Sequence, residues 1–320
     1  MERVIFDTNA YRYLVTGKSF DEIDKYMEKV KSKEKQLDIL PLISPIVVKE
    51  LLAHVADKSD PSHQKCLNAT KALYLHCGDD TSYHLLASPE MLIAKSFFNV
   101  DIPAKEETNK AMMQIAFHLG LYPSDHAERK FQRNLNLNRD HVLDAENFFA
   151  QSFLQWIKAV DPSATGWRVF PNDAAQRRRV LEDLRSERSS INLAAGLIYT
   201  VNDLLVKSGL AESMPETTLI DMSKQFTIIF PEYISLYKSV FENIINSEYN
   251  MYENSRSNFL WDIQLMLNVG NHTVNGEKLH FVTADSAIQS HAINNNAKYT
   301  IHTFNEYMTY IGMMALVDGK

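Results

Sequence analysis

Two short apolar runs, one near each end of the chain, each stop at an aspartate, and this pattern constrains the fold most. Residues 3–6 (Arg-Val-Ile-Phe) precede Asp7, and residues 280–284 (His-Phe-Val-Thr-Ala) precede Asp285. Short apolar runs of this kind are typical of buried strands in a parallel sheet, and ligands bind outside the carboxyl ends of such strands. If the two strands are neighbours, right-handed crossovers place both aspartates at the same edge of the sheet.

Further strands and helices are expected to alternate along the two ends of the chain. The patterns predict additional strands over residues 38–43, 82–87 and 298–302. They predict helices from about Ser19 to about Lys35, after Ser44-Pro45, after Ser88-Pro89 and over residues 286–294. Serine before proline is a favoured helix start, because serine caps the helix and proline fits its first turn. Alternating strands and helices indicate βαβ units and a mostly parallel sheet.

The middle of the chain gives almost only helical signals, from about residue 100 to residue 250. Apolar side chains recur there at helical spacing, as in Phe149, Phe153, Trp156, Ile157 and Val160. Such stripes are typical of the buried face of a helix. The sequence shows no internal repeat and no long glycine- or serine-rich linker. We therefore predict a discontinuous α/β core over residues 1–98 and 255–320, with an all-helical insertion over residues 99–254.

Composition is that of a globular protein, with 45% hydrophobic and 23% charged residues. No apolar run approaches eighteen residues, so we expect no transmembrane helix and no membrane partner. An aspartate follows only three apolar residues at the N-terminus, which argues against a signal peptide. Two cysteines make no disulfide framework, which favours a reduced, cytoplasmic protein. The net charge of -7 argues against a nucleic-acid ligand, although a site built from carboxylates accounts for part of that charge.

Four carboxylates stand where strands end or helices begin. Asp7 and Asp285 follow apolar strands, Glu50 lies in the first turns of the helix after the second strand, and Asp262 starts an apolar helix that leads toward the Asp285 strand. Clustered carboxylates repel one another unless a cation neutralises them. Hard oxygen ligands suit Mg²⁺ and Mn²⁺, and two such ions can clamp the attacking and leaving oxygens of a phosphodiester.

These residues lie in four short motifs that resemble, in family order, the acidic motifs of PIN-domain nucleases, a family that includes VapC-like toxins. The motifs are Val4-Ile5-Phe6-Asp7-Thr8-Asn9, Ile43-Ser44-Pro45-Ile46-Val47-Val48-Lys49-Glu50-Leu51, Trp261-Asp262-Ile263-Gln264-Leu265 and Phe281-Val282-Thr283-Ala284-Asp285. The resemblance covers roughly residues 1–98 and 255–320. It implies a PIN-like parallel sheet flanked by helices, here with a large all-helical insertion that departs from the compact family pattern.

The resemblance also implies an activity. It points to a metal-dependent ribonuclease, an endoribonuclease that hydrolyses RNA with a Mg²⁺- or Mn²⁺-activated water and leaves a 5′-phosphate and a 3′-hydroxyl. Asp7, Glu50 and Asp262 are expected to bind the first metal, and Asp285 completes that site or serves a second ion. Thr8 or Asn9 is expected to orient Asp7 by hydrogen bonding, and Thr283 is expected to do the same near Asp285 or to satisfy the strand end.

Basic residues gather in two stretches of the predicted insertion, and they are candidates for phosphate contacts with RNA. The candidates are Arg129, Lys130 and Arg133 in the first stretch, and Arg177, Arg178, Arg185 and Arg188 on one helix that Asp173 caps in the second. The four arginines of the second stretch fall on one side of a helix, within an arc of about 100°, when each residue turns the helix by 100°. A solvated face with ion pairs is the alternative interpretation.

Other interpretations remain open. A structure-specific DNA nuclease on the same fold, or a catalytically silent scaffold whose insertion binds a protein, are the alternatives to a ribonuclease. An inhibitory or activating protein partner and a homodimer formed through the insertion are further candidates, and a toxin role is left open. Histidine and cysteine residues lack the spacing of a zinc site and are expected to act separately: His54, His63, Cys66, His76 and Cys77.

Overall fold

The structure is a computed structural model, and it describes residues 1–78, 84–253, 256–269, 277–290 and 299–313. Contacts between Cα atoms divide the chain into two units. Unit 1 comprises Met1–Ser88, Pro103–Val142 and Thr273–Lys320. Unit 2 comprises Pro89–Ile102 and Leu143–His272. The boundaries of these units differ from the predicted ones, which lie between residues 98 and 99 and between residues 254 and 255. The division into a nuclease core and a helical insertion therefore stays a prediction.

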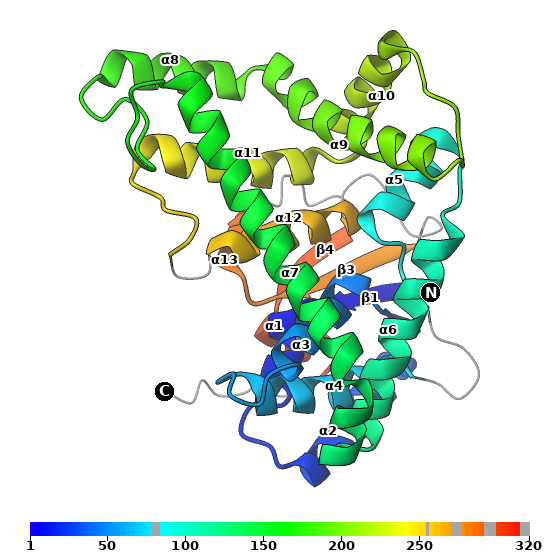
Figure 1. The fold of residues 1–320 in the computed structure, drawn as a ribbon. Helices are drawn as coiled ribbons and strands as arrows, with labels where there is room; N and C mark the ends of the chain where they lie inside the picture. The colour runs from blue at the N-terminus through cyan, green and yellow to red at the C-terminus, as the bar shows by residue number, and fades with distance from the viewer. Residues whose placement is uncertain (79–83, 254–255, 270–276, 291–298, 314–320) are drawn as a thin grey trace. The chain divides into compact units, whose positions relative to one another are not determined.

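A four-stranded sheet forms the centre of unit 1, with strand order β2-β1-β3-β4. The strands are β1 (Glu2–Phe6), β2 (Ile39–Leu42), β3 (Lys278–Thr283) and β4 (Tyr299–Thr303). All three pairings are parallel, and β1 lies beside β3 with Phe6 opposite Val282. Figure 1 shows these strands side by side, although β1 and β3 lie far apart in sequence. The prediction of an α/β fold with a parallel sheet is therefore confirmed. The two strands that end in aspartate are neighbours, which is the condition under which the sequence places both aspartates at one edge of the sheet.

Helices of unit 1 surround this sheet, and several begin at the residues that the sequence indicates. Ser19 caps α2 in a capping box, and Ser44 caps α3 with Pro45 in the first turn, as predicted. The helices of unit 1 are α1 (Thr8–Leu14), α2 (Phe20–Gln36), α3 (Pro45–Val55), α4 (His63–Cys77), α6 (Pro103–Leu121), the first half of α7 (Asp125–Val160), α13 (Ser286–Ser290) and α14 (Phe304–Tyr310). The last residues of the predicted helix over 286–294 lie outside the described residues.

The secondary-structure elements in the described residues of unit 2 are helices joined by loops, as the sequence predicts for the middle of the chain. Unit 2 holds α5 (Pro89–Phe98), the second half of α7, α8 (Ala174–Arg185), α9 (Glu187–Lys207), α10 (Glu216–Ile229), α11 (Pro231–Asn246), η1 (Arg256–Asn258), α12 (Phe259–Leu265) and η2 (Met266–Asn268). Phe149 and Phe153 of α7 pack against Tyr237 and Phe241 of α11. The aromatic stripes of the sequence are therefore helical core.

Three sequence predictions differ from the structure in detail. Of the strand predicted over residues 82–87, the described residues keep only one bridge, between Leu85 and Ile43. The helix predicted to carry all the arginines of the second basic stretch ends at Arg185, because Ser186 is extended and caps a new helix, so that Arg188 lies on α9. The helix that carries Asp262 begins three residues before it, at Phe259.

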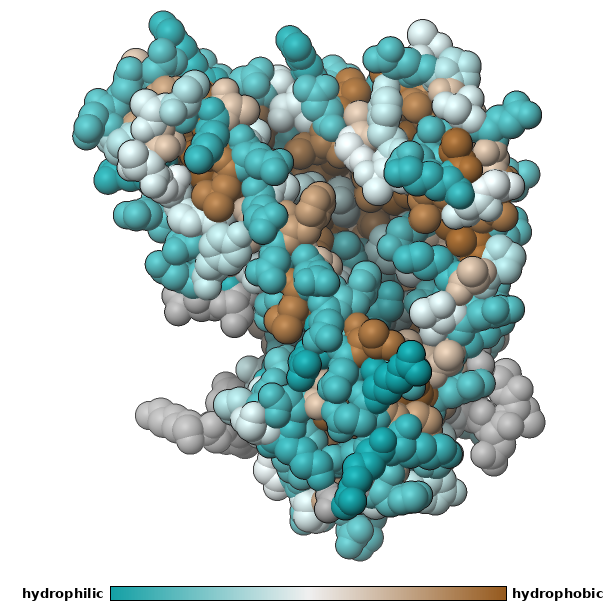
Figure 2. Space-filling model, viewed as in Figure 1, coloured by the Kyte–Doolittle hydropathy of each residue, from teal (hydrophilic) through white to brown (hydrophobic). Residues whose placement is uncertain are grey.

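One helix in the described residues, α9, is long and apolar enough to cross a membrane by length and composition alone. A single helix of this kind is weak support for a membrane span, since core helices of soluble proteins pass the same test. Helix α9 also packs against α10, α5 and α8. In Figure 2, apolar side chains lie between hydrophilic ones over α9 and α10, and Ile228 of α10 is 69% exposed. The absence of a transmembrane helix stays a prediction.

A buried ion pair with its hydrogen-bond partners joins four helices of unit 1. His76 of α4 lies with its Nε2 2.8 Å from Glu34 Oε2 of α2, and both residues are 1% exposed. The Tyr307 hydroxyl of α14 donates to Glu34 Oε1 at 2.8 Å, and the Tyr11 hydroxyl of α1 lies 3.0 Å from His76 Nδ1. Burial by itself lowers the pKa of His76, but the charges of Glu34 and Cys77 outweigh burial and raise it to about 10.

Candidate functional site at the carboxyl ends of β1 and β3

Asp7 lies directly after β1 and is almost completely buried, with 2% of its surface exposed. It caps α1, and its Oδ1 accepts a hydrogen bond from the backbone N–H of Ala10 at 2.5 Å. Its own N–H donates to the carbonyl of Val282 on β3 at 3.0 Å. The strand-to-helix turn after β1 therefore fixes the Asp7 carboxylate beside the carboxyl end of the neighbouring strand.

Thr283 connects Asp7 to Asp285. The Thr283 hydroxyl is buried, donates to Asp7 Oδ2 at 2.5 Å and accepts from the backbone N–H of Asp285 at 2.9 Å. Asp285 then starts α13, where its Oδ1 accepts from the N–H of Ile288 at 3.3 Å. The structure thus brings the two strand-end aspartates together, with Thr283 oriented toward Asp7.

Glu50 reaches the same region from α3 through Thr8. The Thr8 hydroxyl donates to Glu50 Oε2 at 2.6 Å, and Thr8 is 7% exposed. Thr8 directly follows Asp7, so this bond couples the Glu50 carboxylate to the turn that holds Asp7. The side chain of Asn9, the other residue expected to orient Asp7, is exposed.

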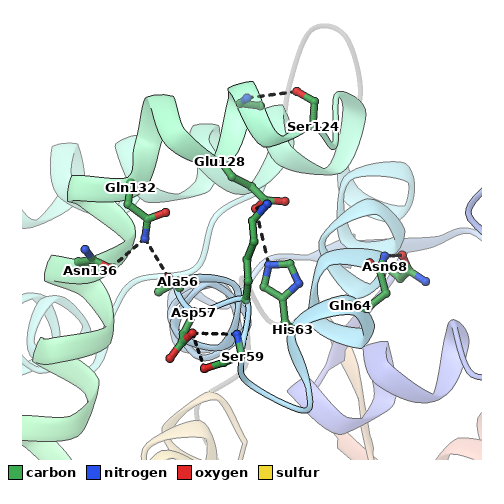
Figure 3. Close-up of polar contacts among 12 residues, drawn as sticks. Ala56, Asp57, Ser59, His63, Gln64, Asn68, Ser124, Glu128, Gln132 and Asn136 are labelled. Atoms are coloured by element: carbon green, nitrogen blue, oxygen red, sulfur yellow. Dashed lines mark hydrogen bonds and ion pairs between the residues drawn. The ribbon is translucent and has the colours of Figure 1, made fainter.

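Polar side chains of α7 hold α3 and the loop that follows it in place, as Figure 3 shows. Gln132 Nε2 donates to the carbonyl of Ala56 at 2.9 Å, and Asn138 Nδ2 donates to the carbonyl of Lys49, the neighbour of Glu50, at 2.8 Å. Glu128, also on α7, lies 3.0 Å from Lys58 Nζ in the loop between α3 and α4. This positioning role of α7 was not predicted from the sequence.

Two basic side chains, Arg12 of α1 and Lys65 of α4, lie within electrostatic range of Cys66, and neither was predicted from the sequence. Arg12 lies four residues after Thr8 on the same face of α1, and its Nη2 donates to Ser62 Oγ at 2.8 Å. Arg12 Nε is buried and has no hydrogen-bond partner in the described part of the chain. Lys65 of α4 lies over the Tyr13 ring at 5.6 Å. The spacing of Arg12 from the Asp7-Thr8 motif is the signal that indicates its position.

The pKa of the buried Cys66 thiol depends on several charged side chains around it. Burial raises its pKa to about 11, the charges of Asp60 and Glu50 also raise it, and the charges of Arg12 and Lys65 lower it. Glu50, Arg12 and Lys65 therefore all lie within electrostatic range of one sulfur atom. Burial and the Arg12 charge together lower the pKa of Lys65, as expected for two cations held near each other.

The Asp7 carboxylate is costly to ionise in this setting. Burial raises its pKa to about 6, and the charge of Asp285 adds to that rise, against hydrogen bonds from Thr283, Ala10 and Ala284 that favour the ionised form. A carboxylate with a raised pKa beside a second carboxylate is typical of sites that take up a proton or a cation.

Asp262 belongs to unit 2, whereas Asp7, Glu50 and Asp285 belong to unit 1. It lies in the first turn of α12, and Trp261 beside it donates from Nε1 to Glu146 Oε1 of α7 at 2.8 Å. Within the described ranges, no three His, Cys, Asp or Glu side chains stand close enough together to hold a metal ion. The structure therefore brings together the pair Asp7 and Asp285, and Thr8 joins Glu50 to the turn that holds Asp7.

The basic residues that are candidates for RNA contact differ in exposure and in whether they have partners within the protein. Arg129, Lys130 and Arg133 are exposed on the half of α7 that belongs to unit 1. In unit 2, Arg178 and Arg188 are exposed, whereas two other arginines have partners within the protein. Arg185 Nε lies 2.8 Å from Glu242 Oε1, and Arg177 Nη1 donates to the carbonyls of Phe170 and Pro171.

No protein-family model matches the chain, no curated protein matches it, and no solved structure matches its fold.

Proposed function

We propose that this protein is a metal-dependent ribonuclease of the PIN-domain class that cuts RNA internally. The observation that carries the proposal is the placement of Asp7 and Asp285 at the carboxyl ends of the adjacent parallel strands β1 and β3, with Thr283 between them. The carboxyl edge of a parallel sheet is where α/β proteins bind their ligands. The proposed acidic set of unit 1 is Asp7, Glu50 and Asp285, and Asp262 of unit 2 stays a candidate from the sequence.

The donors of this set fit a hard divalent cation. Carboxylate oxygens are the ligands that Mg²⁺ and Mn²⁺ prefer, and a cation there offsets the burial and mutual repulsion of Asp7 and Asp285. When bound, such an ion supplies activation of water and stabilisation of charge on the phosphate. Thr283 orients Asp7 and Thr8 orients Glu50, so the protein holds both carboxylates ready for a ligand.

The substrate side of the proposal rests on Arg12 and Lys65. Their guanidinium and ammonium groups, whose charges act on the Cys66 thiol as that of Glu50 does, provide positive charge for the phosphates of a nucleic-acid strand, in a chain whose net charge is -7. The buried Arg12 Nε, which has no partner among the described residues, is a donor that a phosphate oxygen can satisfy. In this proposal local basic charge offsets the overall acidity that argues against a nucleic-acid ligand.

Replacing Arg12 with Gln is expected to raise the KM for a single-stranded RNA about tenfold and to reduce its salt dependence, with a smaller effect on kcat. The reason is that a phosphate contact contributes to binding of the substrate backbone. Steady-state cleavage at several salt concentrations measures both quantities.

Two controls separate this effect from a structural one. Ser62→Ala removes the partner of Arg12 Nη2 and keeps the positive charge, and Arg139→Gln removes a different arginine. Arg139 is only partly exposed, and it pairs with Asp140 rather than with Ser62. Both variants are expected to keep the native KM. An unchanged KM and salt dependence in Arg12→Gln would exclude the phosphate contact.

Cleavage of matched substrates tests which nucleic acid the site takes. The protein is incubated with Mn²⁺ and end-labelled single-stranded RNA, with DNA of the same sequence, and with a branched DNA duplex. We expect internal cuts in the RNA that leave 5′-phosphate ends, and no cuts in either DNA. Cleavage of the branched DNA alone would replace the proposal with a structure-specific DNA nuclease.

A further inference from the structure

A cavity of unit 1 lies at the opposite end of β1 from Asp7. Its volume is about 970 Å³, and its walls come from the first residues of β1, from β2, from α2 and from the last turn of α4. Arg3 of β1 lines it. Because Asp7 follows Arg3 by four positions along an extended strand, the two side chains start about 13 Å apart. The cavity is therefore separate from the candidate nuclease site.

Arg3 is the unusual residue of this cavity. It is 9% exposed, and its Nε is paired with the Glu277 carboxylate. Its Nη1 is buried and has no hydrogen-bond partner in the described part of the chain. A buried guanidinium N–H without an acceptor is costly, so this atom marks a place for an anionic group.

Helix α2 adds positive charge to the same cavity. Lys31 and Lys35 line it, and four residues separate them, so they stand one above the other on one face of the helix. Both are exposed, and neither has an ion pair in the described residues. Most acids of the cavity wall are already neutralised by a cation of the protein, as in the pairs Asp24 with Lys71, Glu34 with His76 and Asp38 with the Met1 amino group.

Part of the cavity wall is apolar, although Glu28, Ser32 and His84 also line it. Ile39, Leu40 and Pro41 of β2 and Leu75 of α4 line the cavity beside the charged residues. A volume of this size matches pockets that take small organic molecules, which are lined by apolar side chains with a few polar groups that fix orientation. An inorganic ion alone would leave this apolar surface uncovered.

We propose that this cavity binds a small organic anion, whose carboxylate or phosphate is received by Arg3 Nη1 with Lys31 and Lys35 and whose apolar body covers Leu40, Pro41 and Leu75. The proposal does not depend on the nuclease function. Ligand bound here contacts the start of β1, the strand that ends at Asp7.

Fluorescence titration of the full chain with 1-anilinonaphthalene-8-sulfonate, an apolar anion, tests the proposal. N-phenyl-1-naphthylamine serves as a neutral probe of similar shape, and octanoate and inorganic phosphate serve as competitors that distinguish a carboxylate from a phosphate ligand. We expect saturable binding of the anionic probe, weaker binding of the neutral one, and displacement by at least one competitor.

Variants that change the charge of residues in the cavity wall test whether the anionic probe binds there. The double variant Lys31→Glu/Lys35→Glu is expected to raise the Kd of the anionic probe at least about tenfold, and Arg3→Gln is expected to do the same. Lys25→Glu/Lys29→Glu makes the same charge change at exposed positions of α2 outside this cavity and is expected to keep the native Kd. Because Lys31 and Lys35 are exposed, their variant is informative even if Arg3→Gln does not fold. Equal binding of the neutral probe, or a native Kd in the Lys31/Lys35 variant, would overturn the proposal.

Discussion

Asp7→Asn is expected to stabilise the metal-free protein by about 2 kcal/mol at pH 7.5 while it lowers RNA cleavage more than about a hundredfold. Burial raises the pKa of Asp7 to about 6 from a usual value of 3.8. The folded state therefore binds the proton more tightly, and the stability this group contributes is full below pH 3.8 and is lost as pH rises through about 6. Asparagine carries no charge to bury, and its oxygen still accepts from the N–H of Ala10.

Urea unfolding in EDTA and cleavage in Mn²⁺ measure the two effects on the same preparations. Mn²⁺ is expected to raise the Tm of the native protein and to leave that of Asp7→Asn unchanged, because a ligand stabilises only the state that binds it. Asp144→Asn, which removes an exposed carboxylate from α7, is the control and is expected to match the native protein in both assays. A less stable Asp7→Asn protein, or one that cleaves RNA normally, would contradict the role assigned to Asp7.

Glu34→Gln is expected to destabilise the protein by about 3–5 kcal/mol at pH 6–7, because it leaves the buried His76 imidazolium without its counter-ion. The pKa of His76 is raised to about 10, so the stability that its charged form contributes is full below pH 6.5 and is lost as pH rises through about 10. The difference between Glu34→Gln and the native protein is therefore expected to shrink between pH 6.5 and pH 10.

Urea midpoints at pH 6, 8 and 10 check this dependence. Glu28→Gln makes the same substitution at an exposed position of α2, and it is expected to change the free energy of unfolding by less than about 0.5 kcal/mol. A cost for Glu34→Gln that does not vary with pH would show that the ion pair does not carry the stability.

Local signals in the sequence were sufficient to predict most of the sheet and several helix starts. The apolar runs before Asp7 and Asp285 form adjacent parallel strands, and Ser19 and Ser44 cap the helices that follow them. Hydrophobic run length and capping chemistry act within a few residues, so they can be read without knowing the fold. Of the predicted strand over 82–87, the described residues form one bridge, at Leu85, because sheet pairing depends on a partner that lies elsewhere in the chain.

The candidate site could be predicted only in part. The proximity of Asp7 and Asp285 follows from strand order, but the hydrogen bond from Thr283 to Asp7 and the bond from Thr8 to Glu50 depend on side-chain geometry across the turn. Arg12 was missed because its role depends on α4 and Ser62, about fifty residues away in sequence. The helix break at Ser186 was missed although Ser186 accepts from the N–H of Ser189, a local cap that the sequence contains.

Cleavage of total cellular RNA by the purified protein tests the central claim most directly. The native protein and Asp285→Asn are each incubated with Mn²⁺, with Mg²⁺ and with EDTA, and the ends of the products are mapped. The proposal predicts discrete internal cuts with 5′-phosphate ends that require the metal and disappear in Asp285→Asn. Cuts that persist in EDTA, cuts that Asp285→Asn still makes, or no cuts with either metal would contradict it.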